Sequence, residues 1–266
     1  MVLPRRAFLI RERYSERMVP PPVRKCSSNC TKSSPCFPHD RARLDIFRDA
    51  RIMEGRGVAP KETDEKKGQE EMKRIAVVYA SRYGHTKLLA EHVASGAGGV
   101  PGTEVAVYTA GEAELALDEL DAADAIVFGT ATYMGSAASE MKHFMESAAG
   151  RWFDRSWCDK IAGGFTNSSN FSGDKLMTMQ ELVVFAMQMG MIWCGVTDLA
   201  GANEPESSKN VEGPTSRALN RNSGSLGVMA SSFQVKAPGA PPIGDLETAS
   251  RYGRRIAEIT HRFAVK

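Results

Sequence analysis

Small hydroxyl-bearing side chains gather where an apolar run gives way to a helical pattern. Residues 81–86 read SRYGHT, directly after the run RIAVVYA at 74–80. Backbone N–H groups at the start of a helix attract anions, so we predict that this segment holds a terminal phosphomonoester. It lacks both the Gly-Lys-Ser/Thr of a Walker loop and the Gly-x-Gly-x-x-Gly spacing of dinucleotide folds. A simpler interpretation stays open, in which Ser81 or Thr86 only caps the helix.

Two more polar loops follow apolar runs: residues 129–139, GTATYMGSAAS, and residues 166–174, TNSSNFSGD. The carboxyl ends of parallel strands meet at one edge of a sheet, so we expect all three loops to line one crevice. In the first of these loops glycines allow close backbone approach, and Tyr133 and Met134 can lie along a ring. The other offers hydroxyl and amide groups. Together the loops predict a ligand with a phosphate at one end and a polar, planar ring at the other.

The elements that must position these loops are short apolar runs alternating with stripes of helical spacing. We expect strands at residues 74–80, 103–109, 124–130, 160–166 and 191–196. The helical stripes are Leu89, Val93 and Ala97; Met141, Phe144, Met145 and Ala148; Leu176, Met179, Val183, Ala186 and Met187; and Leu246, Ala249, Ile256, Ile259 and Phe263. This alternation predicts an α/β fold of three layers, with a five-stranded parallel sheet and helices on both faces.

Residues 198–243 break this rhythm, because they are rich in Gly, Ser, Asn and Pro and show little periodicity. A loop of this length inside a compact domain usually has a function or lacks order. We expect a long insertion after the fifth strand, lying over the site or against a partner subunit.

The 266-residue chain has a net charge of +2 and is 42% hydrophobic, which is enough for a packed core. Residues 1–71 carry a basic excess and no sustained period. We interpret them as disordered, as segments of low hydrophobicity are, or as a gene-model extension upstream of a domain at 72–266. The mildly acidic remainder offers no clustered basic face, so we expect no nucleic-acid partner. No apolar run reaches the ~18 residues of a membrane span.

The five cysteines fall into two groups. Cys158 and Cys194 lie in apolar segments, as free thiols do in a reducing cytoplasm. The others form a cluster with a histidine: Cys26, Cys30, Cys36 and His39. Their spacing matches no usual zinc pattern, so we interpret the cluster as incidental and expect no metal. Acidic residues near the start argue against a targeting peptide, and we expect a cytoplasmic protein.

These motifs resemble the flavodoxin-like superfamily, and most closely the WrbA-type NAD(P)H:quinone oxidoreductases, which bind FMN. The resemblance spans residues 73–263. Residues 81–86 are similar to the family's S-x-Y-G-H phosphate loop, and residues 129–135 to its G-T-P-T-R-F-G flavin-ring loop. In the ring loop Ala131, Tyr133 and Met134 replace the family's proline, arginine and phenylalanine, and residues 167–171 replace a glycine-rich loop. The resemblance implies a flavodoxin-like fold.

The resemblance also implies a cofactor site made of three loops. Its residues would be Ser81, Arg82, Tyr83, Gly84, His85, Thr86, Thr130, Ala131, Thr132, Tyr133, Met134, Gly135, Thr166, Asn167, Ser168, Ser169 and Asn170. Trp152 falls where the family keeps a tryptophan beside the ring, and Met189 where it keeps a histidine before a Gly-Met pair. We expect both in the substrate pocket.

By the same resemblance we expect an FMN-dependent enzyme of the NAD(P)H:quinone oxidoreductase or NAD(P)H-dependent FMN reductase type. Two electrons would pass from NAD(P)H to the flavin and then to a quinone-like acceptor by a ping-pong mechanism, with the chemistry on FMN and no catalytic side chain. NADH and NADPH stay open, and a homo-oligomer, dimer or tetramer, is implied. Two alternatives remain: a flavodoxin-type electron carrier, which tends to be shorter and more acidic, and a non-enzymatic flavodoxin-fold scaffold or regulator.

Overall fold

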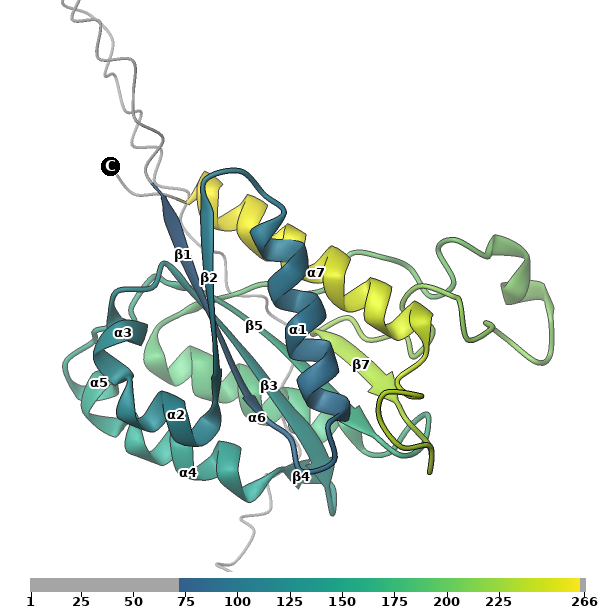
Figure 1. The fold of residues 1–266 in the computed structure, drawn as a ribbon, viewed down its shortest axis with the longest axis horizontal. Helices are drawn as coiled ribbons and strands as arrows, with labels where there is room; N and C mark the ends of the chain where they lie inside the picture. Colours follow the sequence, from purple (N-terminus) through teal and green to yellow (C-terminus); the bar gives the residue numbers. More distant parts are fainter. Residues whose placement is uncertain (1–71, 264–266) are drawn as a thin grey trace, which may run out of the picture. The chain divides into compact units, whose positions relative to one another are not determined.

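The computed structural model describes residues 72–263, which fold around a parallel sheet (Figure 1). Its four long strands are β1 (Lys73–Ala80), β2 (Thr103–Thr109), β3 (Ala125–Tyr133) and β5 (Ile161–Ser168). They lie in the order β2-β1-β3-β5, and every pairing between them is parallel. β1, β3 and β5 are buried along almost their whole length, because helices cover both faces of the sheet. The predicted α/β class is confirmed, and so are the first four predicted strands.

The fifth position of the sheet is divided between two short strands. β6 (Ile192–Trp193) pairs with the start of β5, and β7 (Val228–Ser231) pairs with its end. After β6 the chain leaves the sheet, and the Val196 amide donates to the Ser225 carbonyl (3.0 Å) at the far end of the excursion. The predicted strand at 191–196 is therefore too long, and the insertion interrupts the fifth strand instead of following it. The excursion, with its short 3₁₀ helix η1 (Pro205–Lys209), extends away from the sheet beyond β7 (Figure 1).

Helices form the two outer layers. α1 (His85–Gly98) and α7 (Ile243–Arg262) cover one face of the sheet; α2 (Ala110–Leu115), α3 (Leu117–Asp121), α4 (Ser139–Ser147), α5 (Ala149–Phe153) and α6 (Lys175–Met189) cover the other. α1 and α7 approach closely through glycines. A Cβ on Gly96 would lie 1.8 Å from the Ser250 carbonyl oxygen, and one on Gly253 would lie 1.9 Å from that of Val93. Larger side chains at these two positions would therefore force the helices apart.

The predicted stripe of α6 is correct only in part. Its members Met179 and Ala186 are buried, but Leu176 and Met187 are about half exposed, and Leu182, outside the predicted stripe, is buried. The helix turns its polar first residue, Lys175, inward, and the buried positions then follow the helical period from that residue. The stripes of α1 and α4 are confirmed at their buried residues, whereas α2, α3 and α5 are too short to give a periodic signal.

No helix in the range 72–263 is both long and apolar enough to cross a membrane. Two of the sequence-based interpretations concern residues 1–71, namely the unstructured extension and the incidental cluster of Cys26, Cys30, Cys36 and His39. Both lie outside the described residues.

Candidate functional site

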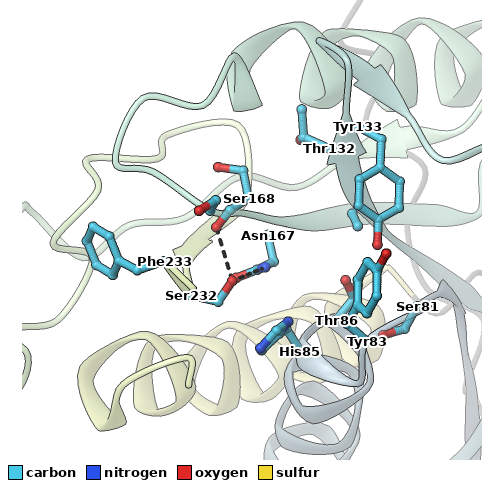
Figure 2. A pocket seen from close by; sticks show the side chains of 12 residues that line it. Ser81, Tyr83, His85, Thr86, Thr132, Tyr133, Asn167, Ser168, Ser232 and Phe233 are labelled. Carbon is cyan, nitrogen blue, oxygen red and sulfur yellow. Dashed lines mark hydrogen bonds between the residues drawn. The ribbon is translucent and has the colours of Figure 1, made fainter. Parts of the chain in front are cut away.

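The carboxyl ends of β1, β3, β5 and β7 border a pocket of about 250 Å³ (Figure 2). The predicted residues that line it are Ser81, Tyr83, His85, Thr86, Ala131, Thr132, Tyr133, Asn167, Ser168 and Ser169. Two more lining residues, Ser232 and Phe233, follow β7. The structure therefore brings the three loops together at one edge of the sheet, as expected. A fourth segment, which follows β7, joins them.

The first loop leads into the N-terminus of α1. Gly84 takes a left-handed conformation, with φ of 87°, and occupies the N-cap position, where it has no side chain to offer. Among the hydrogen bonds of the described residues, neither the Ser81 nor the Thr86 hydroxyl caps an α1 amide. The capping interpretation therefore does not explain these two hydroxyls. They line the pocket beside a helix end whose amides carry partial positive charge, an arrangement that suits an anion.

Arg82, in the same loop, contacts α4 and does not line the pocket. Its Nε donates to Glu140 Oε1 (2.7 Å) and its Nη2 to Ser139 Oγ (2.8 Å). The Arg82 guanidinium lowers the pKa of Glu140 to about 2 through this hydrogen bond. Arg82 thus fixes the loop against the start of α4, and its charge is already engaged.

Two tyrosines flank the pocket. The rings of Tyr83 and Tyr133 meet edge to face with centroids 6.4 Å apart, and the Arg82 guanidinium lies 5.3 Å from the Tyr133 centroid. Tyr83 is exposed, with 72% of its surface accessible. Figure 2 shows both phenols directed toward each other beside the pocket. They give this end of the site an aromatic border that can accept a flat ring.

The second loop is a tight hairpin between β3 and β4 (Ser136–Ala137). Its two central residues, Met134 and Gly135, have φ of 50° and 80°, as a two-residue type I′ turn requires. Glu181 anchors the returning strand by accepting from the Ser136 hydroxyl (2.7 Å) and the Ala137 amide (2.8 Å). Tyr133 lines the pocket, but Met134 lies fully exposed at the hairpin tip and does not.

Threonines behind the wall hold the loops in place. Thr130, with no exposed surface, accepts from the Ala138 amide (3.0 Å). Thr132 Oγ1 lies 2.8 Å from the hydroxyls of both Thr166 and Thr178. Thr130 and Thr166, predicted as cofactor contacts, therefore support the site from inside the fold, because their hydroxyls are committed to neighbouring protein groups.

The third loop contains an unpaired acceptor. Asn167 is 5% exposed, and its Nδ2 donates to Ser232 Oγ (3.0 Å). Its Oδ1 is the one buried side-chain oxygen or nitrogen of residues 72–263 that has no hydrogen-bond partner. Since buried polar groups nearly always find partners, this oxygen marks a position where a ligand can donate. The sequence pointed to Asn167 but not to its partner Ser232.

Residues that follow β7 close the pocket beside the first loop. His85 Nε2 lies 2.8 Å from the Val235 carbonyl oxygen, to which it donates. Phe233 packs edge to face against Phe171, with ring centroids 5.1 Å apart. Sequence analysis missed this wall because it assigned residues 198–243 to a loop, although the apolar stretch SLGVMASSFQV within it was the available signal.

Three of the residues predicted as cofactor contacts do not line the pocket: Gly84, Gly135 and Asn170. They shape the loops instead. Gly84 and Gly135 supply left-handed turns, and the Asn170 carbonyl accepts from Lys175 Nζ (2.6 Å). These positions set the course of the backbone.

The structure does not bring Trp152 or Met189 to the pocket of the same chain. Trp152 is half exposed on α5, where the neighbouring Arg151 binds Asp121, just ahead of β3. Met189 is buried in the core at the end of α6, and the next residue, Gly190, accepts from an amide just ahead of β5. Both positions belong to the amino ends of the strands, whereas the pocket borders the carboxyl ends.

Known proteins are similar to this chain in sequence and in fold. The flavodoxin family profile matches residues 77–175. Flavodoxin FldP of Pseudomonas aeruginosa (strain UCBPP-PA14) is 39% identical over 189 residues, covering 71% of this chain and 97% of that protein. An NAD(P)H dehydrogenase (quinone) of Chromohalobacter salexigens is 33% identical over 146 residues, covering 47% and 72%. The crystal structure of a flavodoxin, WrbA-like protein from Agrobacterium tumefaciens has 34% identity and a TM-score of 0.52, covering 71% and 98%.

These likenesses define a flavodoxin-fold protein of the WrbA type, as the sequence motifs predicted. The chain belongs to the flavodoxin family. Membership implies a flavin cofactor, for which the three loops described above are the candidate site.

Proposed function

We propose that the pocket binds FMN and that the protein transfers two electrons from NAD(P)H to a quinone-like acceptor. The observation that best supports FMN as the cofactor is the unpaired Oδ1 of Asn167. A phosphate ion alone would satisfy the hydroxyls and amides at the start of α1 but would give this oxygen no donor. FMN has a phosphate at one end, and hydroxyl and ring N–H donors along the rest of the molecule. It therefore matches the donors of the first loop and the acceptor on the third.

Bound flavin supplies the electron-transfer chemistry. The chain's own part is to hold the phosphate at Ser81 and Thr86, to offer Asn167 Oδ1 as an acceptor to the cofactor, and to border the ring with Tyr83 and Tyr133. Among the described residues, no carboxylate, lysine or cysteine lines the pocket, and the His85 imidazole donates to the Val235 carbonyl. The proposed role of the side chains is to orient the cofactor, and the electron transfer needs no side-chain general acid or base. One pocket that serves two flat substrates in turn supports ping-pong kinetics.

The electron donor and acceptor are proposed from relatives. The protein from Chromohalobacter salexigens, and a second relative from Geobacter sulfurreducens that is 31% identical over 144 residues, are each named NAD(P)H dehydrogenase (quinone). The sequence resemblance points to the same reaction and to a homo-oligomer, and the free thiols of Cys158 and Cys194 favour the cytoplasm. The first test is an FMN titration of the purified protein, followed by steady-state oxidation of NADH and NADPH with benzoquinone. We expect saturable FMN binding and parallel double-reciprocal plots.

Asn167→Leu tests the cofactor assignment directly. It leaves the hydroxyl or N–H donors of FMN without a buried acceptor, so we expect FMN affinity to fall about tenfold or more. Asn210→Leu, on the exposed excursion, is the matched control and should bind FMN like the wild type. Equal FMN affinity for Asn167→Leu and the control would overturn the role of this oxygen. A wild-type protein that does not bind FMN would overturn the proposed function.

A second candidate function is electron carriage without turnover of NAD(P)H. The 39% identity to a protein named flavodoxin FldP favours it. The two functions separate in one measurement, because rapid mixing of FMN-loaded protein with NADPH or NADH bleaches the flavin in an oxidoreductase and leaves it oxidised in a carrier. Sedimentation of the same sample determines the oligomeric state.

A further inference from the structure

A buried ammonium group lies at the start of α6, behind the third loop of the pocket. Lys175 is 1% exposed, and its Nζ donates to Ser168 Oγ (2.9 Å), the Asn170 carbonyl (2.6 Å) and Ser231 Oγ (3.0 Å). All three partners are neutral oxygens. Lys175 therefore ties the loop after β5 to strand β7, although 34 residues of insertion separate β6 from β7 in the sequence.

Two further charges lie in the same cluster and largely cancel each other. Arg221 Nε donates to Asp245 Oδ1 (2.9 Å), and the Ser231 amide donates to Asp245 Oδ2 (3.0 Å). The side chains of Arg221 and Asp245 are 5% and 1% exposed. Among the described residues, Asp245 and Arg221 are the charged groups that act on Lys175. Two cations and one carboxylate leave this buried cluster with one net positive charge.

The cluster lies one hydrogen bond behind the pocket. Ser168 lines the pocket and accepts from Lys175, while Ser231 precedes the pocket residue Ser232. Burial lowers the pKa of Lys175 to about 8, so the ammonium is still charged at pH 7. A buried charge without a counter-charge is costly, and a negative charge that arrives with a ligand lowers that cost.

We propose that the cluster of Lys175, Arg221 and Asp245 tunes the electrostatics of the pocket in favour of the more negatively charged form of its ligand. This proposal rests on FMN as that ligand. Transfer of two electrons and one proton from NAD(P)H, which leaves as NAD(P)⁺, adds one negative charge to the bound flavin. A net positive charge behind Ser168 binds this reduced form more tightly than the oxidised form. Lys175 acts through Ser168 and is a positioning residue, not a catalytic one.

Two variants of opposite charge test the proposal. Lys175→Met removes the positive charge, and Asp245→Asn adds one by removing the carboxylate. The readout is the two-electron midpoint potential of protein-bound FMN at pH 7, together with the affinity for oxidised FMN. We expect Lys175→Met to weaken binding of the reduced form relative to the oxidised form about tenfold, which lowers the potential by about 30 mV, and Asp245→Asn to raise it.

Lys160→Met is the matched control. Lys160 is a half-buried ammonium, and it donates to the Asp121 carbonyl (2.7 Å) and to that of Ala123, near the amino end of β3. Its removal should leave the potential at the wild-type value. Lys175→Arg keeps the charge and should also keep the potential. Should Lys175→Met not fold, Asp245→Asn still decides the sign, with Lys175→Arg as the reference that keeps the charge.

The outcomes separate the two proposals. If wild-type protein binds no FMN, the proposed function is wrong and this inference is wrong with it. If wild-type protein binds FMN but both charge variants keep the wild-type potential, or shift it in the same direction, the inference alone is overturned and the cluster is only structural. A pH series adds a second check, since the difference between wild type and Lys175→Met should shrink from pH 7 to pH 9.5 as Lys175 loses its proton.

Discussion

The buried Lys175 predicts an unusual dependence of stability on pH. Burial lowers its folded-state pKa from the ordinary 10.5 to about 8. Between these two values the unfolded chain binds a proton that the folded chain has released, so the free energy of unfolding rises with pH. At 1.36 kcal/mol per pH unit, the gap corresponds to about 3 kcal/mol. Below pH 8 both states carry the charge, and the folded protein bears the full cost of burying it.

The Lys175→Met variant has no titrating group at this position, so comparing it with wild type isolates the pH dependence that is due to Lys175. Urea unfolding of both proteins at pH 7, 8.5 and 10 gives the difference in unfolding free energy, in which the titration of every other group cancels. We expect wild type to gain about 2.5 kcal/mol on the variant as pH rises from 7 to 10. A difference in unfolding free energy that stays constant across this range, within the error of extrapolation, would refute the claim that burying the charged Lys175 destabilises the folded protein.

Two further predictions concern backbone positions and are read from urea unfolding at pH 7. Gly253→Ala places a methyl group 1.9 Å from the Val93 carbonyl, so it should destabilise the protein by about 3 kcal/mol, whereas Gly111→Ala, with nothing within 4 Å, should stabilise it by about 0.5 kcal/mol. Equal effects would contradict the close packing of α1 on α7. Met134→Asn should stabilise the protein by about 1 kcal/mol, because Asn tolerates the left-handed conformation at the hairpin tip; a loss of stability would mean that the exposed methionine has a structural contact.

The sequence was sufficient for those parts of the site that follow from topology. Apolar runs located the long strands, and parallel strands bring the loops after them to one edge of a sheet. Ser81, Thr132 and Asn167 therefore meet in space as expected, although some 86 residues separate the first from the last. The strands can be recognised in the sequence because a strand buried on both faces of the sheet needs a continuous apolar run.

The direction of individual side chains could not be predicted in the same way. Arg82 has the residue type of a phosphate ligand, but the carboxylate of Glu140, 58 positions along the chain, engages it. Nothing in the sequence marks Lys175 as an interior residue, yet it is among the most deeply buried residues. A distant carboxylate engages Arg82, whereas Lys175 binds two oxygens of the preceding loop and Ser231 of a distant strand. Such side-chain contacts leave no periodic signal in one sequence.

The divided fifth strand connects the insertion to the proposed cofactor site. A four-residue strand that returns after a long excursion is too short to stand out as a pattern, yet it places Ser232 where it holds the Asn167 amide and Phe233 where it packs on Phe171. The His85 contact with Val235 joins the same segment to the first loop. The orientation that leaves Asn167 Oδ1 open to a ligand thus depends on residues beyond the excursion. The segment after β7 is therefore a structural part of the pocket's wall, and a shortened insertion must preserve the register of β7 on β5 to keep the site intact.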